Sequence, residues 1–196
     1  MAQDRDASKT VGFLFIEPFA DWEFGLLSAS LGEWFGGKAI SISPDGKPVR
    51  SIGGFLLTPD RSADPDANRD LDGLAVIGSD SWAASPPDVA PLLKSIAARG
   101  GVVGGICAGT LALARAGLFE NAAHTSNEEA WLNQVLPDYP GRANYRQLDH
   151  ATADGRIVSA PGSAPGTFAA TFLEALYPEK AEAIGGMRAM FAKEYS

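Results

Sequence analysis

Residues 100–119, GGVVGGICAGTLALARAGLF, carry the pattern that decides the fold. A short apolar run with glycines leads to Cys107, and an alanine- and leucine-rich stretch follows it. A buried strand that turns sharply into a helix, with a reactive residue at the corner, is typical of a nucleophile elbow. The corner places the Cys107 sulfur at the positive end of the helix, so we expect a lowered thiol pKa. The same pattern also suits a small buried hydrophobic residue.

Apolar runs of strand length alternate with amphipathic segments on both sides of this elbow. We expect strands at residues 11–16, 38–43, 74–77, 102–106, 149–154 and 156–159. We expect helices at residues 22–34, 89–99, 110–117, 128–136 and 166–176, and a last one from Pro178 that breaks at Gly185 and Gly186. Residues 49–58 predict a hairpin at the sheet edge, and residues 61–69 an irregular loop. The alternation predicts an α/β fold in three layers, a mostly parallel central sheet with helices on both faces.

Ligands of such folds bind beyond the carboxyl ends of the strands. This layout gathers Glu23, Gly78, Cys107 and Asn127 around one pocket. The sequence therefore predicts a single site there.

Composition narrows the class of protein. The 196 residues suit one domain, and we expect residues 1–10 to form a disordered polar tail ahead of a single domain at residues 11–196. A net charge of −8 argues against nucleic acid as a partner. One cysteine cannot form an internal disulfide, which favours the cytoplasm. The chain shows no signal peptide and no membrane-spanning run, and its two histidines and one cysteine argue against a metal site.

Several motifs together resemble those of the DJ-1/PfpI superfamily, within the class I glutamine amidotransferase-like fold. They are DWE at residues 21–23, the strand at 74–78, GICAG at 105–109, HTSN at 124–127 and GSAPGT at 162–167. The resemblance implies a flavodoxin-like sandwich, a homodimer, and an elbow cysteine that reacts without a cofactor. The face of the first helix that carries Phe24, Leu27 and Leu31 is a candidate dimer surface, although it also suits plain core.

The resemblance assigns roles to particular residues. Glu23 matches the acid that contacts the cysteine sulfur, where burial beside that sulfur would raise its pKa and keep the carboxyl protonated. Without the family, Glu23 would be a solvated carboxylate that favours the helix dipole. Gly78 and Ser79 stand where the family often has two glycines, and their N–H groups with that of Ala108 would form an oxyanion hole.

Two departures from the family concern histidine. Ala108 follows the cysteine where protease-like members have a histidine, and Asn127 stands where DJ-1-like members have one. His124 and His150 match no catalytic position of the family. Because a Cys–His–acid triad needs an imidazole to take the thiol proton, the sequence argues against peptidase and glutaminase activity.

Two functions fit these residues. In the first, the Cys107 thiolate adds to a small electrophile such as an α-oxoaldehyde or an isocyanide, Glu23 shuttles the proton, and the outcome is glyoxalase/deglycase-like or hydratase-like. In the second, the protein is a non-catalytic sensor of oxidative stress whose Cys107 oxidises to a sulfinate, since no second cysteine can form a disulfide. Turnover that is lost in Cys107→Ser would favour the enzyme.

Overall fold

The computed structural model describes residues 8–193, and its centre is a seven-stranded sheet. In spatial order the strands are β5 (Arg61–Ser62), β2 (Lys38–Ser43), β1 (Thr10–Leu14), β6 (Gly73–Val76), β7 (Val102–Ile106), β9 (Ile157–Ala160) and β8 (Thr152–Asp154). All neighbouring pairs are parallel except β8 and β9. Continuous apolar strands suit such a sheet because both of its faces are covered: every residue of β6 and β7 is buried.

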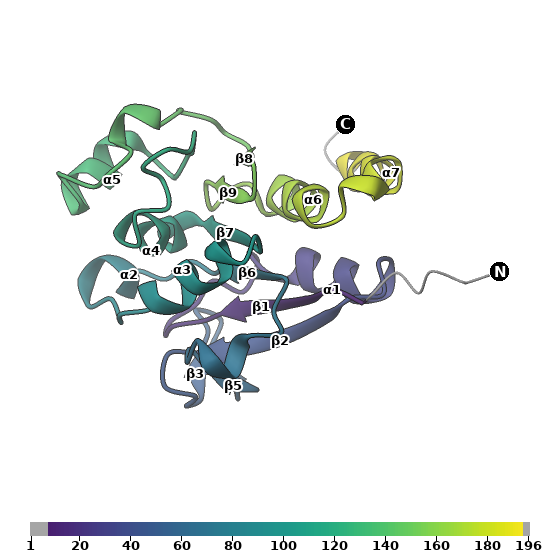
Figure 1. Cartoon of the computed structure of the whole chain (residues 1–196), viewed down its shortest axis with the longest axis horizontal. Coiled ribbons are helices and arrows are strands. Elements are labelled where there is room, and N and C mark those ends of the chain that lie inside the picture. Colours follow the sequence, from purple (N-terminus) through teal and green to yellow (C-terminus); the bar gives the residue numbers. More distant parts are fainter. Residues whose placement is uncertain (1–7, 194–196) are drawn as a thin grey trace.

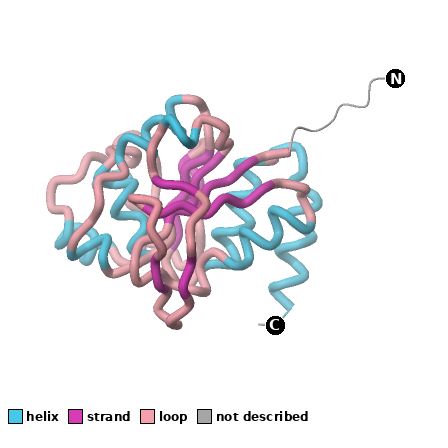
Figure 2. Tube along the Cα trace, turned by 90° about the horizontal axis from the view of Figure 1, so that it is seen from below, coloured by secondary structure: helices cyan, strands magenta, loops and turns pink. Residues whose placement is uncertain are grey.

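Helices cover both faces of the sheet (Figures 1 and 2). On one face lie α1 (Gly25–Glu33), α6 (Pro165–Leu176) and α7 (Ala181–Ala192), which bury Leu27, Phe172 and Ile184 in one core cluster. The other face carries α2 (Ser81–Ala84), α3 (Ala90–Ala98), α4 (Thr110–Arg115) and α5 (Glu129–Val135), and a second cluster contains Leu92 and Leu132. The predicted three-layer α/β sandwich is confirmed.

Short elements complete the fold. Single-turn helices are η1 (Asp66–Asn68), η2 (Cys107–Gly109), η3 (Arg142–Asn144) and η4 (Pro178–Lys180). The predicted hairpin consists of β3 (Val49–Arg50) and β4 (Leu56–Leu57), which pair with each other in a separate two-stranded sheet. None of the helices within residues 8–193 has the length and apolar character needed to cross a membrane.

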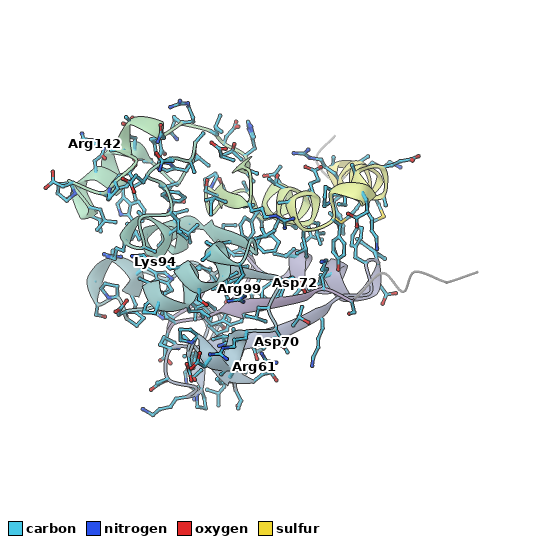
Figure 3. All side chains as sticks on the ribbon, viewed as in Figure 1. Arg61, Asp70, Asp72, Lys94, Arg99 and Arg142 are labelled. Atoms are coloured by element: carbon cyan, nitrogen blue, oxygen red, sulfur yellow. The ribbon has the colours of Figure 1, made fainter. Side chains whose placement is uncertain are left out.

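Several boundaries differ from the prediction. The first helix begins at Gly25 instead of residue 22, because residues 21–24 form turns, from which Glu23 accepts the N–H of Gly78. Residues 61–69 contain the edge strand β5, which the ion pair between Arg61 and Asp70 anchors at 2.6 Å (Figure 3). The expected tail at residues 1–10 lies largely outside the described residues, but its last residue, Thr10, opens β1 and donates its N–H to Asp72.

The predicted break at Gly185 and Gly186 is wrong. Helix α7 continues through both glycines to Ala192, and Ile184 and Met187 on either side of them are buried. Burial of these two side chains against α6 outweighs the weak helix propensity of two glycines, about 1 kcal/mol each.

Four adjacent strands bring distant segments to one edge of the sheet. The chain turns from β1 to β2 on one side and then crosses to β6 on the other, so the β1–β6 boundary is a topological switch point. The segments that follow β1, β6, β7 and β9 contain Glu23, Gly78, Cys107 and Gly162. The fold therefore assembles the candidate site from strand exits, as expected.

Candidate active site

Cys107 sits in a strained backbone conformation at the exit of β7. Its φ angle is 56°, and it is the one non-glycine residue between 8 and 193 with a positive φ. Strand β7 leads straight into η2 and then α4, so the sulfur stands on a sharp strand-to-helix turn. Since a non-glycine residue in this region costs about 1–3 kcal/mol, the surrounding structure must hold it there. This geometry is that of a nucleophile elbow.

Two hydrogen-bond donors point at the sulfur. The Asn127 side-chain amide donates from Nδ2 to Cys107 Sγ at 3.2 Å, and the backbone N–H of Ala108 donates to it as well. Asn127 in turn accepts through Oδ1 from the N–H of Gly162 at 2.9 Å. Asn127 therefore connects the sulfur to the loop that follows β9.

Glu23 reaches the sulfur from the turn before α1. Only 1% of Glu23 is exposed, and its Oε2 accepts the backbone N–H of Gly78 at 2.6 Å. Its Oε1 is buried with no hydrogen-bond partner among the described residues, and the Cys107 thiol is its titratable neighbour. The structure thus brings the predicted acid and the predicted nucleophile into contact.

Two glycines make this close packing feasible. A Cβ atom at Gly78 would lie 2.6 Å from Glu23 Oε2, and one at Gly162 would lie 2.8 Å from Cys107 Sγ. Neither position has room for a larger residue unless the acid or the sulfur moves. The two glycines therefore define the walls between which Glu23 and Cys107 meet.

Burial raises the pKa of both members of the pair. Desolvation raises the pKa of Glu23 to about 7, against the lowering effect of the Gly78 N–H. Desolvation, followed by the negative charge of Glu23, raises the pKa of Cys107 to about 11. Because the groups are neighbours, the two ionisations are coupled: the charge of one disfavours the charge of the other.

The predicted lowering of the Cys107 pKa is therefore wrong in direction. Asn127 and the Ala108 N–H do lower it, but desolvation and the carboxylate outweigh them. The predicted rise for Glu23 agrees in direction, yet its value near 7 leaves much of the carboxyl ionised at neutral pH. A carboxylate beside a thiol is an arrangement for taking the thiol proton.

The expected role of Gly78 in an oxyanion hole is also wrong, because its N–H is occupied by Glu23. Ser79 is buried, with 3% of its surface exposed, and its N–H donates to no acceptor within the described part of the chain. The Ala108 N–H is directed to the sulfur. Of the three N–H groups predicted to hold an oxyanion, that of Ser79 is available.

The model of the DJ-1/PfpI family matches residues 9–175. The chain belongs to the DJ-1/PfpI family. The DJ-1 superfamily protein Atu0886 from Agrobacterium tumefaciens is 36% identical, with a TM-score of 0.86 over 96% of this chain and 100% of that one. The proteins YoaZ and YdeA of Bacillus subtilis (strain 168), both named uncharacterized proteases, are each 30% identical. The YoaZ match covers 80% of this chain and 78% of YoaZ, and the YdeA match covers 83% and 80%.

Neither histidine of this DJ-1/PfpI protein serves the sulfur. His124 is fully buried, stacks on Phe119 at 3.9 Å between ring centroids, and bonds through its two nitrogens to Ala122 O and Tyr139 Oη. Burial lowers its pKa, which keeps the ring neutral. His150 is half exposed and pairs with Asp149. Both are structural side chains, as their mismatch with the family positions suggests.

Four residues that shape the site of this DJ-1/PfpI protein were given no role in the site from the sequence: Trp22, Gly162, Thr110 and Ser126. Trp22 donates its indole N–H to Gly162 O at 3.0 Å and so fixes the loop beside the sulfur, although the indole is 54% exposed. From the sequence, Gly162 was identified only as the first residue of the GSAPGT motif. Thr110 and Ser126 form a buried hydroxyl pair next to the elbow. The sequence signal for Thr110 and Ser126 was their position as hydroxyl residues beside the Cys107 and Asn127 motifs.

Proposed function

We propose that this protein is a cysteine-dependent enzyme that acts on small electrophilic carbonyl compounds or isocyanides, in a glyoxalase/deglycase-like or hydratase-like reaction. The observation that carries the proposal is the contact between the Cys107 thiol and a carboxyl group whose pKa is about 7. A general base works best when its pKa lies near the working pH, so Glu23 takes the place that an imidazole has in a Cys–His pair.

The first step is addition to the substrate. For an α-oxoaldehyde, the Cys107 Sγ–carbon bond forms as the carbonyl π bond breaks, and the thiol proton passes to Glu23. The carbonyl oxygen becomes an alkoxide, which the Ser79 N–H is available to stabilise. Glu23 then returns the proton to that oxygen, which leaves a neutral hemithioacetal.

The remaining steps need only water. The carboxylate of Glu23 takes the proton from the carbon bonded to sulfur, and the adjacent carbonyl carbon receives it, so that the hemithioacetal isomerises to a thioester. Water then cleaves the thioester to a 2-hydroxy acid and restores the thiol. For an isocyanide, addition of the thiol to the terminal carbon and hydrolysis yield a formamide. No metal or organic cofactor enters either balance.

Turnover of methylglyoxal and of an alkyl isocyanide, measured from pH 5.5 to 9, tests this mechanism. Because Glu23 must be ionised to accept the thiol proton, we expect the rate to rise with pH through about 7. Cys107→Ser should abolish turnover, and Glu23→Gln should lower kcat about 100-fold and remove the rise near pH 7. Glu33→Gln, an exposed carboxylate at the end of α1, the helix that follows Glu23, is the matched control and should leave both unchanged. Turnover retained by Cys107→Ser would refute the proposal.

The alternative, a stress-responsive redox sensor, is favoured by one observation: Cys107 is the single cysteine, so oxidation would lead to a sulfinate. The raised pKa of the thiol opposes it, since peroxide reacts with the thiolate. Mild peroxide followed by mass spectrometry separates the two. A gain of two oxygen atoms at Cys107, with every carbonyl substrate untouched, would favour the sensor.

We also propose that the protein acts as a cytoplasmic homodimer. Of the two alternatives for the first-helix face, the structure supports plain core: Leu27 and Leu31 are fully buried, and Phe24 packs on Phe15. Large apolar side chains are exposed on the β3–β4 hairpin instead, at Ile52 (56%), Phe55 (74%) and Leu56 (58%). Large exposed apolar side chains gathered on one hairpin are typical of a protein interface.

A further inference from the structure

We propose that Thr110 and Ser126 are positioning residues. Together with Asn127 they close a ring of hydrogen bonds around Cys107 and hold its sulfur in the orientation needed for reaction. We call these four residues the elbow ring. The inference deepens the proposed function, because it concerns the geometry of the same nucleophile. It stands on bond distances and burial within the described residues.

The first side of the ring holds the backbone of the nucleophile. Thr110 Oγ1 donates to the carbonyl oxygen of Cys107 at 2.6 Å. Thr110 is fully buried, so this bond has no competition from water. The accepting carbonyl belongs to the residue with a φ of 56°, so the bond fixes the peptide on which the strained conformation depends.

The second side links the elbow to the neighbouring segment. Thr110 Oγ1 and Ser126 Oγ lie 2.7 Å apart, and Ser126 is also fully buried. A hydroxyl has one proton, and that of Thr110 is given to the Cys107 carbonyl. Ser126 must therefore be the donor of this second bond. The direction of both bonds follows: Ser126 to Thr110 to Cys107 O.

The third side returns to the sulfur. Asn127 follows Ser126 in the chain and donates from Nδ2 to Cys107 Sγ at 3.2 Å. Two consecutive residues of one segment thus connect to both ends of Cys107: Ser126 reaches its carbonyl oxygen through Thr110, and Asn127 bonds directly to its sulfur. If the Thr110–Ser126 bond is broken, Asn127 is no longer fixed relative to the elbow, and the alignment of its amide with Sγ relaxes.

Alkylation of Cys107 by iodoacetamide tests the ring without any assumption about the substrate. We expect Thr110→Val to lower the alkylation rate at pH 8 about tenfold, the equivalent of one lost hydrogen bond to the reacting group. Ser126→Ala should act in the same direction. The double variant should be no slower than Thr110→Val, because one bond chain is broken once. Thr110→Ser keeps the hydroxyl and should restore the wild-type rate.

The matched control is Thr125→Val, which removes an equally buried hydroxyl from the same segment. That hydroxyl bonds to the backbone carbonyls of Ser126 and Leu148 and to neither Thr110 nor Cys107. Its alkylation rate should equal that of the wild type. Rates are compared only for variants with a cooperative thermal transition, and Ser126→Ala carries the test if Thr110→Val does not fold. Folded ring variants that react within twofold of the wild type would overturn the inference, as would an equal loss in Thr125→Val or losses that multiply in the double variant.

The pH profile separates this inference from the proposed function. Glu23 accepts the N–H of Gly78 and no bond from Thr110, Ser126 or Asn127. The turnover rate of the ring variants should therefore still rise with pH near 7, from a lower overall level. A wild-type profile without that rise would count against Glu23 as the base, yet the rate ratios of the ring variants would still decide for or against the ring.

Discussion

At the scale of single residues, the space around the sulfur is set by Gly162. A Cβ there would lie 2.8 Å from Cys107 Sγ, 2.9 Å from its Cβ and 3.2 Å from Glu23 Oε1, all within the reacting pair. The neighbouring Gly166, in the first turn of α6, has no atom within 4 Å of such a Cβ. Two glycines four positions apart thus differ in what they exclude.

Gly162→Ala should therefore slow alkylation of Cys107 at least tenfold and lower the free energy of unfolding by about 1–3 kcal/mol, because the added methyl group must displace the sulfur or the carboxyl. Gly166→Ala should leave alkylation unchanged and stabilise the protein by about 0.5–1 kcal/mol. Alkylation rates and urea unfolding of both variants check this. An unhindered sulfur in Gly162→Ala would contradict the packing described here.

Sequence reasoning reached the residues of the site but not their bonds. Cys107, Glu23 and Asn127 could be predicted to meet because each follows a strand or opens a helix at one sheet edge. The partner of the Gly78 N–H could not be predicted, since a donor's choice between a substrate oxygen and Glu23 depends on distances of a few tenths of an ångström. The direction of the Cys107 pKa failed for the same reason, because depth of burial decides it.

At the scale of elements, periodicity predicted the long strands and helices and missed what is short or held by packing. Strand β5 has two residues, too few for any hydrophobic pattern, and it exists through its pairing with β2. Helix α7 contains two glycines that local propensity treats as a break, yet contact with α6 preserves it. Tertiary contacts decided both elements.

Replacement of Gly185 and Gly186 by alanine should raise the free energy of unfolding by about 1–2 kcal/mol in total, since both lie within α7 with no atom within 4 Å of an added Cβ. Gly36→Ala is the opposing control: it also has open space, but its φ is +65°, so alanine should destabilise by about 1 kcal/mol. Urea midpoints at constant m-value measure both. A helix that truly ended at Gly185 would show no gain.

At the scale of the whole molecule, the β3–β4 hairpin lies outside the main sheet yet is tied to the site. Phe19 bridges to Ser51, and Asp21 accepts the N–H of Gly53 at 2.8 Å, two residues before Glu23. The exposed apolar side chains of the hairpin therefore belong to a segment that is bonded to the turn carrying Glu23. A second copy bound there would cover the approach to that turn.

Phe55→Ser combined with Leu56→Ser should convert the proposed dimer to a monomer, because it removes the two most exposed large apolar side chains of the hairpin. Light scattering after size-exclusion chromatography measures the mass. Met190→Ser, on α7 and 48% exposed, is the control and should leave the dimer intact. If only the Met190 variant dissociates, the interface lies on α7 and not on the hairpin. A monomeric wild-type protein would contradict the proposed dimer.

The left-handed backbone conformation of Cys107 favours glycine for stability, whereas thiol reactivity requires cysteine at the same position. Glycine would adopt that φ angle without strain, so Cys107→Gly should lack thiol reactivity but have a higher free energy of unfolding. A β-branched replacement should be the most destabilising. A screen of random variants for thermal stability alone would therefore select variants that have lost Cys107. A screen that also requires thiol reactivity would have to select stabilising substitutions at other positions.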